Sequence, residues 1–560
     1  MMPIYSFEKK YEMNELKSKQ GQYKLNPLID FYKKTNAFTP KNDYYNYVNS
    51  DWIEKIKLTK NEKHITKIDT CRLIQYKVFN EINDIYKNVI NVNSTKKEVV
   101  NMREFYISAQ NLLSKEQCKT YINKFINYLD NLRTQSIKNN LWKLLAFISK
   151  NKIISEDAPL SFNMSPNEKN TNKYCIHITP ITVPTASTIN MYIDNTSKYI
   201  KKKNTYLEYI QSYLDLTIDN NTLKSTDIHS VLKDIFLCFS TTNFNNESNG
   251  YNKVNKEESI EKYRFNFEEY CKELGFNDIP NYFIVSNLDY LKNVCELMLR
   301  NWKTPKWRTY WIGIFVKQII RFTKDYKNIN DAFYLKFLKG QETDFSDEIR
   351  AIRLTLLPYN KMLSDLYIEK YNNSTLINYL NNITIDIKQV FYKMIQTNTW
   401  LEEKTKKKAL LKLDHLKIIV GQSPDQINDP DLNYISYDVW HNLLSYNEWK
   451  HNEYLTLNEK DVKHLPIIKW TEYPFEYVGS QSFIVNANYT STTNSIYIPL
   501  AYIQEPFISL KGDSSIDYNL ANIGFTIAHE LSHSLDNVGA NYDYNGNLNN
   551  WWTHSDKKKI

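Results

Sequence analysis

Apolar residues recur at helical spacing through most of the chain. This spacing predicts helices over residues 73–90 and 141–154. Residues 301–420 predict a series of long helices whose core includes a group of aromatic side chains: Trp302, Trp307, Tyr310, Trp311 and Phe315. The pattern therefore favours a mainly α-helical protein with small β elements.

Three stretches depart from the helical spacing. Residues 159–179 alternate in the manner of strands, with Ser165-Pro166-Asn167 as a turn. Residues 483–489 also predict a strand. Between them, residues 422–460 contain Pro424 and Pro430, and we expect a mobile connection there.

The length of 560 residues allows more than one domain. Residues 1–35 are polar and predict a loosely ordered lead-in. We expect residues 36–300 to form an N-terminal, mostly helical lobe. Residues 301–560 are expected to hold a helical linker region followed by the part that carries the chemistry.

Composition and charge exclude several classes of protein. The net charge is 71 − 63 = +8. The sequence has no basic stripe interleaved with aromatic residues, the pattern that would predict nucleic-acid binding. No uninterrupted apolar run reaches the length of a membrane span, and the N-terminus has no apolar signal segment. We therefore expect a soluble protein, intracellular by default. None of the six cysteines forms a CxxC pair, so they are interpreted as buried thiols.

The motif His-Glu-x-x-His, formed by His529, Glu530 and His533, is the main candidate for chemistry. On a helix, positions four apart share one face, so the two imidazoles can bind one tetrahedral zinc ion. Glu530 can then reach a water molecule without being a ligand itself. Asp536 follows three residues later and can hold an imidazole N–H from behind. The five-residue motif also arises by chance on ordinary helices, so its surroundings matter.

The surroundings extend the match. Several segments resemble the neprilysin family of zinc endopeptidases: residues 400–413, Asn486-Ala487-Asn488-Tyr489, Pro499, Gln504-Glu505-Pro506-Phe507 and residues 541–552. The resemblance covers residues from about 40 to 553. It implies two largely helical lobes around a cavity, with a thermolysin-like zincin catalytic lobe that is incomplete at its C-terminus.

The resemblance also implies a reaction. One Zn²⁺ per chain, bound by His529 and His533, would activate a water, with Glu530 as the general base for hydrolysis of short peptides. Asn486 and Ala487 match the family residues that bind the substrate backbone. Asn488 replaces the usual aromatic residue, which changes one side-chain contact.

The third zinc ligand has no counterpart. In the family it is a Glu in a downstream Glu-x-x-x-Asp helix, but no Glu follows Glu530 here, and Gly539 stands where a metzincin has its third His. The remaining candidates are Asp543, His554 and Asp556. Three interpretations stay open: a truncated chain or one completed by a separately encoded C-terminal piece, an inactive peptide-binding relative, or an unexpected ligand.

Overall fold

The computed structural model describes residues 39–55, 69–137, 140–182, 192, 196–239, 250–422, 428–462, 467–469, 476–478, 481–510 and 516–559. The helices described up to residue 301 are α2 (Tyr44–Lys55), α3 (Thr70–Ile90), α4 (Lys97–Asn111), α5 (Lys115–Thr134), α6 (Asn140–Lys150), α7 (Lys152–Ser155), α9 (Ser197–Thr217), α10 (Ser225–Phe236), α11 (Lys256–Tyr263), α12 (Phe267–Leu274) and α13 (Leu288–Asn301). The later ones are α14 (Pro305–Ile319), α15 (Lys327–Asp331), α16 (Asp347–Thr355), α17 (Asn360–Tyr371), α18 (Ser374–Gln396), α19 (Glu403–Asp414), α20 (Val439–Leu457), α21 (Ile516–Asn519), α22 (Phe525–Ser532) and α23 (His554–Lys557). The prediction of a mainly helical protein is confirmed.

The predicted helix over residues 73–90 is confirmed as α3. It begins where the Asp69 side chain accepts a hydrogen bond from the Arg72 N–H at 2.8 Å. The prediction over residues 141–154 was wrong in its continuity, because it forms two helices, α6 and α7. Asn151 separates them and caps α7, since its side chain accepts from the N–H groups of Ile153 and Ile154.

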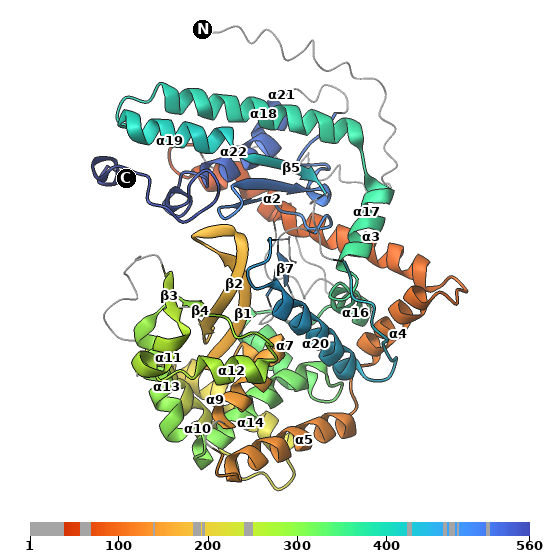
Figure 1. The fold of residues 1–560 in the computed structure, drawn as a ribbon. Helices are drawn as coiled ribbons and strands as arrows, with labels where there is room; N and C mark the ends of the chain where they lie inside the picture. Colours follow the sequence, from red (N-terminus) through yellow and green to blue (C-terminus); the bar gives the residue numbers. More distant parts are fainter. Residues whose placement is uncertain are drawn as a thin grey trace.

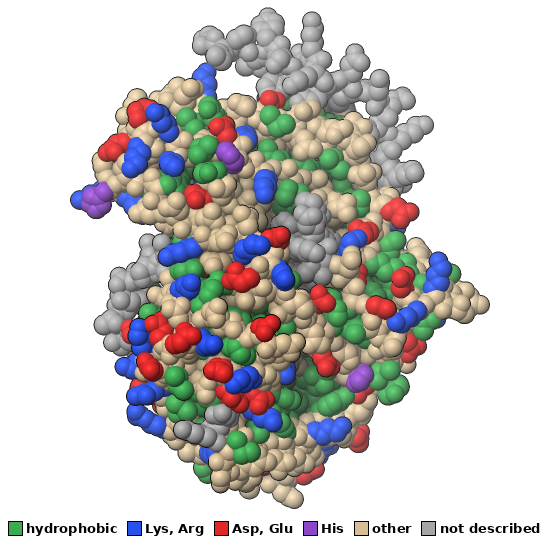
Figure 2. Space-filling model, in the orientation of Figure 1, with side chains coloured by type: hydrophobic (Ala, Val, Ile, Leu, Met, Phe, Trp, Pro, Cys, Tyr) green, Lys and Arg blue, Asp and Glu red, His purple; other side chains and the backbone are tan. Residues whose placement is uncertain are grey.

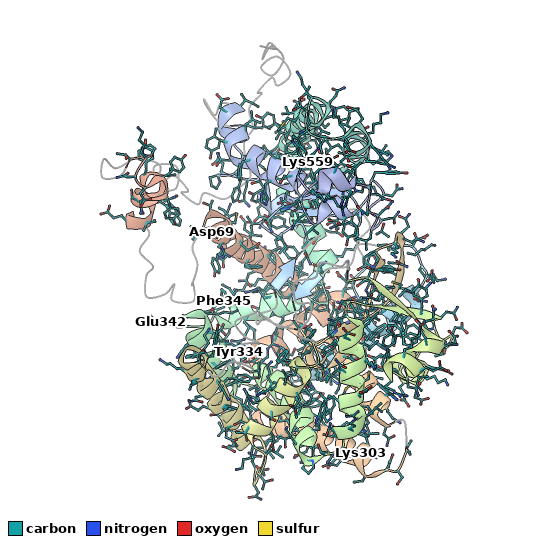
Figure 3. All side chains as sticks on the ribbon, turned by 90° about the vertical axis from the view of Figure 1, so that its left-hand side faces the viewer. Asp69, Lys303, Tyr334, Glu342, Phe345 and Lys559 are labelled. Carbon is teal, nitrogen blue, oxygen red and sulfur yellow. The ribbon has the colours of Figure 1, made fainter. Side chains whose placement is uncertain are left out.

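The elements gather into an upper and a lower part in Figure 1. The upper part contains α18, α19 and α22 with strand β5 (Lys417–Gly421), and the lower part contains α9 to α14 with strands β1 to β4. α14 packs on α5, α9 and α10, whereas α3 packs on α16 and α17. The division near residue 300 stays a prediction. Figure 3 shows Lys559 in the upper part and Lys303 near the lower end.

The lower sheet has the strand order β1-β2-β4-β3, formed by β1 (Leu160–Asn167), β2 (Asn170–Pro180), β4 (Tyr282–Val285) and β3 (Asn252–Asn255). β1 and β2 are antiparallel, which confirms the strands predicted over residues 159–179. Their turn lies at Glu168 and Lys169, later than predicted. The Asn167 side chain accepts from the Lys169 N–H at 3.0 Å and so fixes the turn there.

A second sheet, with the order β5-β9-β8, lies in the upper part. β9 (Ser495–Pro499) is parallel to β5 and antiparallel to β8 (Asn488–Thr490). A separate two-stranded pair consists of β6 (Ile467–Lys469) and β7 (Glu476–Val478).

The strand predicted over residues 483–489 is wrong for most of its length, because only Asn488 and Tyr489 belong to β8. The backbone before β8 pairs with a side chain instead of a strand. Gln75 of α3 donates to the Phe483 carbonyl at 3.0 Å and accepts from the Val485 N–H at 2.8 Å. These bonds satisfy the backbone groups that a sheet would otherwise have paired.

The connection predicted over residues 422–460 is also wrong, because α20 occupies Val439–Leu457. Asp438 starts this helix by accepting a hydrogen bond from the His441 N–H at 2.9 Å. Val439, Trp440 and Leu443 are fully buried on one face. Burial of that face outweighs the proline signals, which lie earlier in the chain.

All six cysteines are free thiols in the structure. The expectation of buried thiols is confirmed for five of them and wrong for Cys71, which is half-buried. Positive and negative side chains are interspersed on the face shown in Figure 2. Within the part of the chain that the structure describes, no helix combines the length and apolar character needed to cross a lipid bilayer.

Candidate active site

α22 (Phe525–Ser532) carries the His-Glu-x-x-His motif, and its apolar face anchors it. Ile527 and Leu531 are completely buried. The opposite face leaves His529 exposed and His533 half-buried. Because His533 keeps helical backbone angles as the C-cap residue, the four-residue spacing of the two imidazoles is preserved.

The two imidazoles converge on one point. Their Nε2 atoms lie 3.1 Å apart. Two Zn–N bonds of about 2.05 Å at a tetrahedral angle would separate the two nitrogens by about 3.3 Å. The pair therefore has the spacing of two ligands of one zinc ion.

Asp536 fixes the orientation of the His533 ring. Its Oδ2 lies 2.7 Å from His533 Nδ1, and its Oδ1 accepts from the N–H groups of Val538 and Gly539 at 2.9 and 2.7 Å. Burial disfavours the charged carboxylate, but the bonds from Gly539, His533 and Val538 outweigh it and hold the pKa of Asp536 below its usual value. An ionised Asp536 keeps the proton on Nδ1, which leaves the Nε2 lone pair available.

Glu530 is buried beside the histidines and is held by the neighbouring strand. The Tyr489 N–H of β8 donates to Glu530 Oε2 at 2.8 Å. Burial raises the pKa of Glu530, and the Tyr489 N–H and the two histidines oppose this rise. This bond fixes the orientation of the carboxylate and leaves lone pairs on it that can accept a proton.

The described residues bring together His529, Glu530 and His533 as a group whose ligand atoms all lie within 4.8 Å of one another. The three further ligand candidates lie outside this group. Asp543 accepts from the N–H groups of Asn545 and Asn547. Asp556 is buried and accepts from the Glu402 N–H at 3.0 Å, and His554 begins α23 beside it.

Gly539 lies too close to the motif to carry a side chain. A Cβ atom there would lie 1.9 Å from the His533 carbonyl oxygen. The structure therefore agrees with the sequence in excluding a metzincin-type ligand at this position.

Asn486 and Ala487, the predicted substrate-binding residues, come directly before β8, which packs beside α22. Asn486 is exposed, whereas Ala487 is buried. The structure thus places both residues directly before the edge strand of the β5-β9-β8 sheet, the strand that contacts α22.

Sequence reasoning missed two residues that connect the parts of this site. Lys412 of α19 is completely buried below the loop that follows α22, and Asn494 is buried in the turn between β8 and β9. One signal was available for Lys412. It continues the buried face of α19 formed by Thr405 and Ala409, a position where a lysine is unusual.

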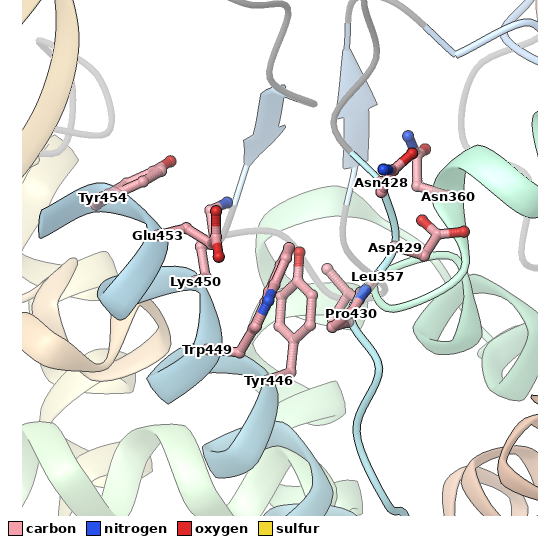
Figure 4. Close-up of a pocket in the computed structure, with 10 residues that line it drawn as sticks. All are labelled: Leu357, Asn360, Asn428, Asp429, Pro430, Tyr446, Trp449, Lys450, Glu453 and Tyr454. Carbon is pink, nitrogen blue, oxygen red and sulfur yellow. The ribbon is translucent and has the colours of Figure 1, made fainter. Parts of the chain in front are cut away.

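A separate pocket lies between α20 and the start of α17, and Figure 4 shows its lining. None of its lining residues belongs to the histidine motif. Asp429 accepts from the N–H groups of Lys361 and Met362 there, which caps α17. Burial raises the pKa of Asp429 to about 6.

Comparisons with known proteins agree with this geometry. Two sequence profiles described as peptidase family M13 match residues 40–424 and 486–560. A neutral endopeptidase of Lactococcus lactis subsp. lactis is 24% identical over 532 residues, covering 92% of this chain and 79% of that protein. The zinc metalloproteinase R519 of Acanthamoeba polyphaga mimivirus is 25% identical over 427 residues, covering 75% of this chain and 65% of that protein.

The fold has a counterpart among solved structures. The crystal structure of the Mycobacterium tuberculosis zinc metalloprotease Zmp1 in complex with an inhibitor superposes with a TM-score of 0.77. It is 18% identical in sequence, and the match covers 95% of this chain and 78% of that one.

Proposed function

The chain belongs to peptidase family M13, and we propose that it is a zinc metalloendopeptidase that hydrolyses peptide bonds of small peptides at the His529–Glu530–His533 site. The observation that carries this proposal is the convergence of the two Nε2 atoms, 3.1 Å apart, beside the buried Glu530. The names of the relatives, a neutral endopeptidase and a zinc metalloproteinase, support the same activity.

His529 and His533 would hold the metal through Nε2, with Asp536 orienting His533. Bound there, zinc would act as a Lewis acid that polarises the scissile carbonyl and makes water a better nucleophile. Catalytic zinc sites usually have three protein ligands. Among the described residues, the two histidines lie with Glu530 in one group of possible ligands.

Glu530 would carry the proton. As the water oxygen forms its bond to the carbonyl carbon, the Glu530 carboxylate takes a proton from the water. The protonated Glu530 then gives this proton to the amide nitrogen as the C–N bond breaks, so the products are a carboxylic acid and an amine. The Tyr489 N–H keeps the carboxylate in place.

The substrate would lie along β8. β8 is the edge strand of its sheet among the described strands, and an edge strand can pair with an extended peptide through backbone hydrogen bonds. Asn486 and Ala487 would hold the peptide backbone just before this strand, because they directly precede the strand that contacts α22.

Zinc content and peptide cleavage test the proposal together. We expect the purified chain to retain about one zinc, and His529→Ala to lose it, while the exposed His441→Ala serves as the matched control. Glu530→Gln should retain the metal and lower the cleavage rate roughly 10²- to 10⁴-fold, as expected for loss of a general base.

A chain that retains no zinc and cleaves none of a mixed peptide library would contradict the proposal. Peptide binding without cleavage would then favour a catalytically inactive peptide-binding protein. Cleavage that survives Glu530→Gln unchanged would refute the role of Glu530.

A further inference from the structure

Two buried residues link the loop behind His533 to the strand that holds Glu530. Lys412 of α19 lies under the loop after α22, and Asn494 lies in the turn between β8 and β9. They come from segments far apart in the sequence, and neither contacts the reacting atoms. We propose that this pair, the Lys412–Asn494 bridge, positions His533 and Glu530 relative to each other. The inference rests on the function proposed above.

The first half of the bridge holds the loop. Lys412 Nζ donates to the carbonyl oxygens of Gly539 and Tyr542 at 2.6 and 2.7 Å. The N–H of the same Gly539 donates to Asp536 Oδ1 at 2.7 Å, and Asp536 Oδ2 lies 2.7 Å from His533 Nδ1. Lys412 therefore fixes Gly539, the residue whose N–H holds the carboxylate behind the imidazole.

The second half holds the strand. Asn494 Nδ2 donates to the Lys412 carbonyl at 2.9 Å, and Asn494 Oδ1 accepts from the Tyr489 hydroxyl at 3.0 Å. The N–H of Tyr489 donates to Glu530 Oε2. Asn494 also donates to the Tyr544 carbonyl at 3.1 Å, so it contacts the loop as well as the strand.

The two halves form a continuous path from His533 through Asp536, Lys412 and Asn494 to Glu530. The Lys412 ammonium group also lies 5.9 Å from the centre of the Tyr489 ring. Asn494 has a φ of 45°, a left-handed conformation that Asn adopts more readily than most residues. A buried cation is costly unless it is fully hydrogen-bonded, so a lysine at this position needs these loop carbonyls.

This arrangement differs from ordinary helix packing in what it predicts. If Lys412 only stabilised α19, its replacement would loosen α19 and its neighbours. If Lys412 positions the site, its replacement would loosen two distant segments together, residues 536–542 and residues 486–494. Those are the segments that contact His533 and Glu530.

Amide hydrogen exchange followed by mass spectrometry separates the two cases. We expect Lys412→Met to exchange roughly tenfold faster than wild type in both segments. Lys408→Met is the matched control, because Lys408 is an exposed lysine on the same helix. Ala409→Gly weakens α19 at a buried position without removing a loop contact, and it should leave both segments protected.

Zinc affinity gives a second readout, measured by competition with a chromophoric chelator. Lys412→Met should bind zinc more weakly than wild type, by less than the roughly 10- to 100-fold expected for loss of a group that directly holds a metal ligand, because Lys412 acts through Gly539 and Asp536. Lys408→Met should bind it as wild type does. An Asn494→Ala variant should affect the same two segments, which checks that the bridge acts as one unit.

The proposal would be overturned if both segments exchanged at the same rate in Lys412→Met as in Lys408→Met. It would also be overturned if Ala409→Gly lost protection in both segments as Lys412→Met does. Unchanged zinc affinity in Lys412→Met would overturn its link to His533. If the wild-type chain takes up no zinc, the proposed function fails, while the exchange experiment still decides the positioning role.

Discussion

Replacing Asp536 by Asn should separate the two tasks of this carboxylate. Oδ1 accepts both loop N–H groups, from Val538 and Gly539, whereas Oδ2 alone faces His533 Nδ1. In Asp536→Asn, the amide oxygen can keep the loop bonds while the NH₂ group points at the imidazole. Because an NH₂ group donates, it would move the ring proton from Nδ1 to Nε2 and occupy the lone pair that the metal needs.

The expected magnitudes differ for the two tasks. Loss of a group that orients a metal-binding His typically lowers metal affinity about 10- to 100-fold, which equals about 1.4–2.8 kcal/mol at 25 °C. The stability of the metal-free chain should change by less than about 1 kcal/mol, because the loop bonds remain. Asp536→Ala removes all three bonds and should lower both zinc affinity and stability.

Zinc competition with a chromophoric chelator and urea unfolding of the metal-free chain measure these two quantities. The expected pattern is a selective loss of affinity in Asp536→Asn and a combined loss in Asp536→Ala. Zinc binding by Asp536→Asn within about twofold of wild type would refute the tautomer reasoning. A destabilisation equal to that of Asp536→Ala would refute the assignment of the loop bonds to Oδ1.

Three further predictions concern stability and the contact between the two parts of the molecule. Ile527 is completely buried on α22. Ile527→Ala should therefore lower the free energy of unfolding in urea by about 2–5 kcal/mol, and Ile527→Val by about 0.5–1.5 kcal/mol. Equal stability of the two variants would contradict tight packing around Ile527. Burial lowers the pKa of His451 to about 4, so its contribution to stability is present above pH 6.5 and is lost as the pH falls towards 4, at up to about 1.4 kcal/mol per pH unit. His451 contacts the Leu274 carbonyl at 2.7 Å, and a Gln at this position can still donate to it. His451→Gln should reduce the difference between the urea midpoints at pH 7 and pH 5. An unchanged difference would assign that pH dependence to other groups. The Asn547 side chain accepts from the Thr171 N–H at 2.9 Å and so joins the β1–β2 hairpin to the loop after α22. Asn547→Ala should speed amide exchange at Thr171, whereas the control Asn549→Ala should not. Equal exchange in both variants would show that this contact does not hold the hairpin.

Local patterns in the sequence were sufficient for much of the fold and for the centre of the site. The spacing of apolar residues predicted α3, and the alternation over residues 159–179 predicted the β1–β2 hairpin. The four-residue spacing of His529 and His533 was enough to predict adjacent imidazoles, because a helix fixes that geometry by itself. Asp536 was predicted for the same reason, since three residues bring it to nearly the same face.

The tertiary structure decided what depends on distant partners. Gln75 pairs with the backbone at Phe483 and Val485 across more than 400 residues, and no local pattern in residues 483–489 could indicate that it would replace a strand. α20 forms because the core buries Trp440, although the preceding prolines predicted a connection. The Lys412–Asn494 bridge exists only where α19, β8 and the loop after α22 meet. The sequence determined the groups that can do the chemistry, and packing determined what holds them, because a buried polar group is stable only beside partners that the fold supplies.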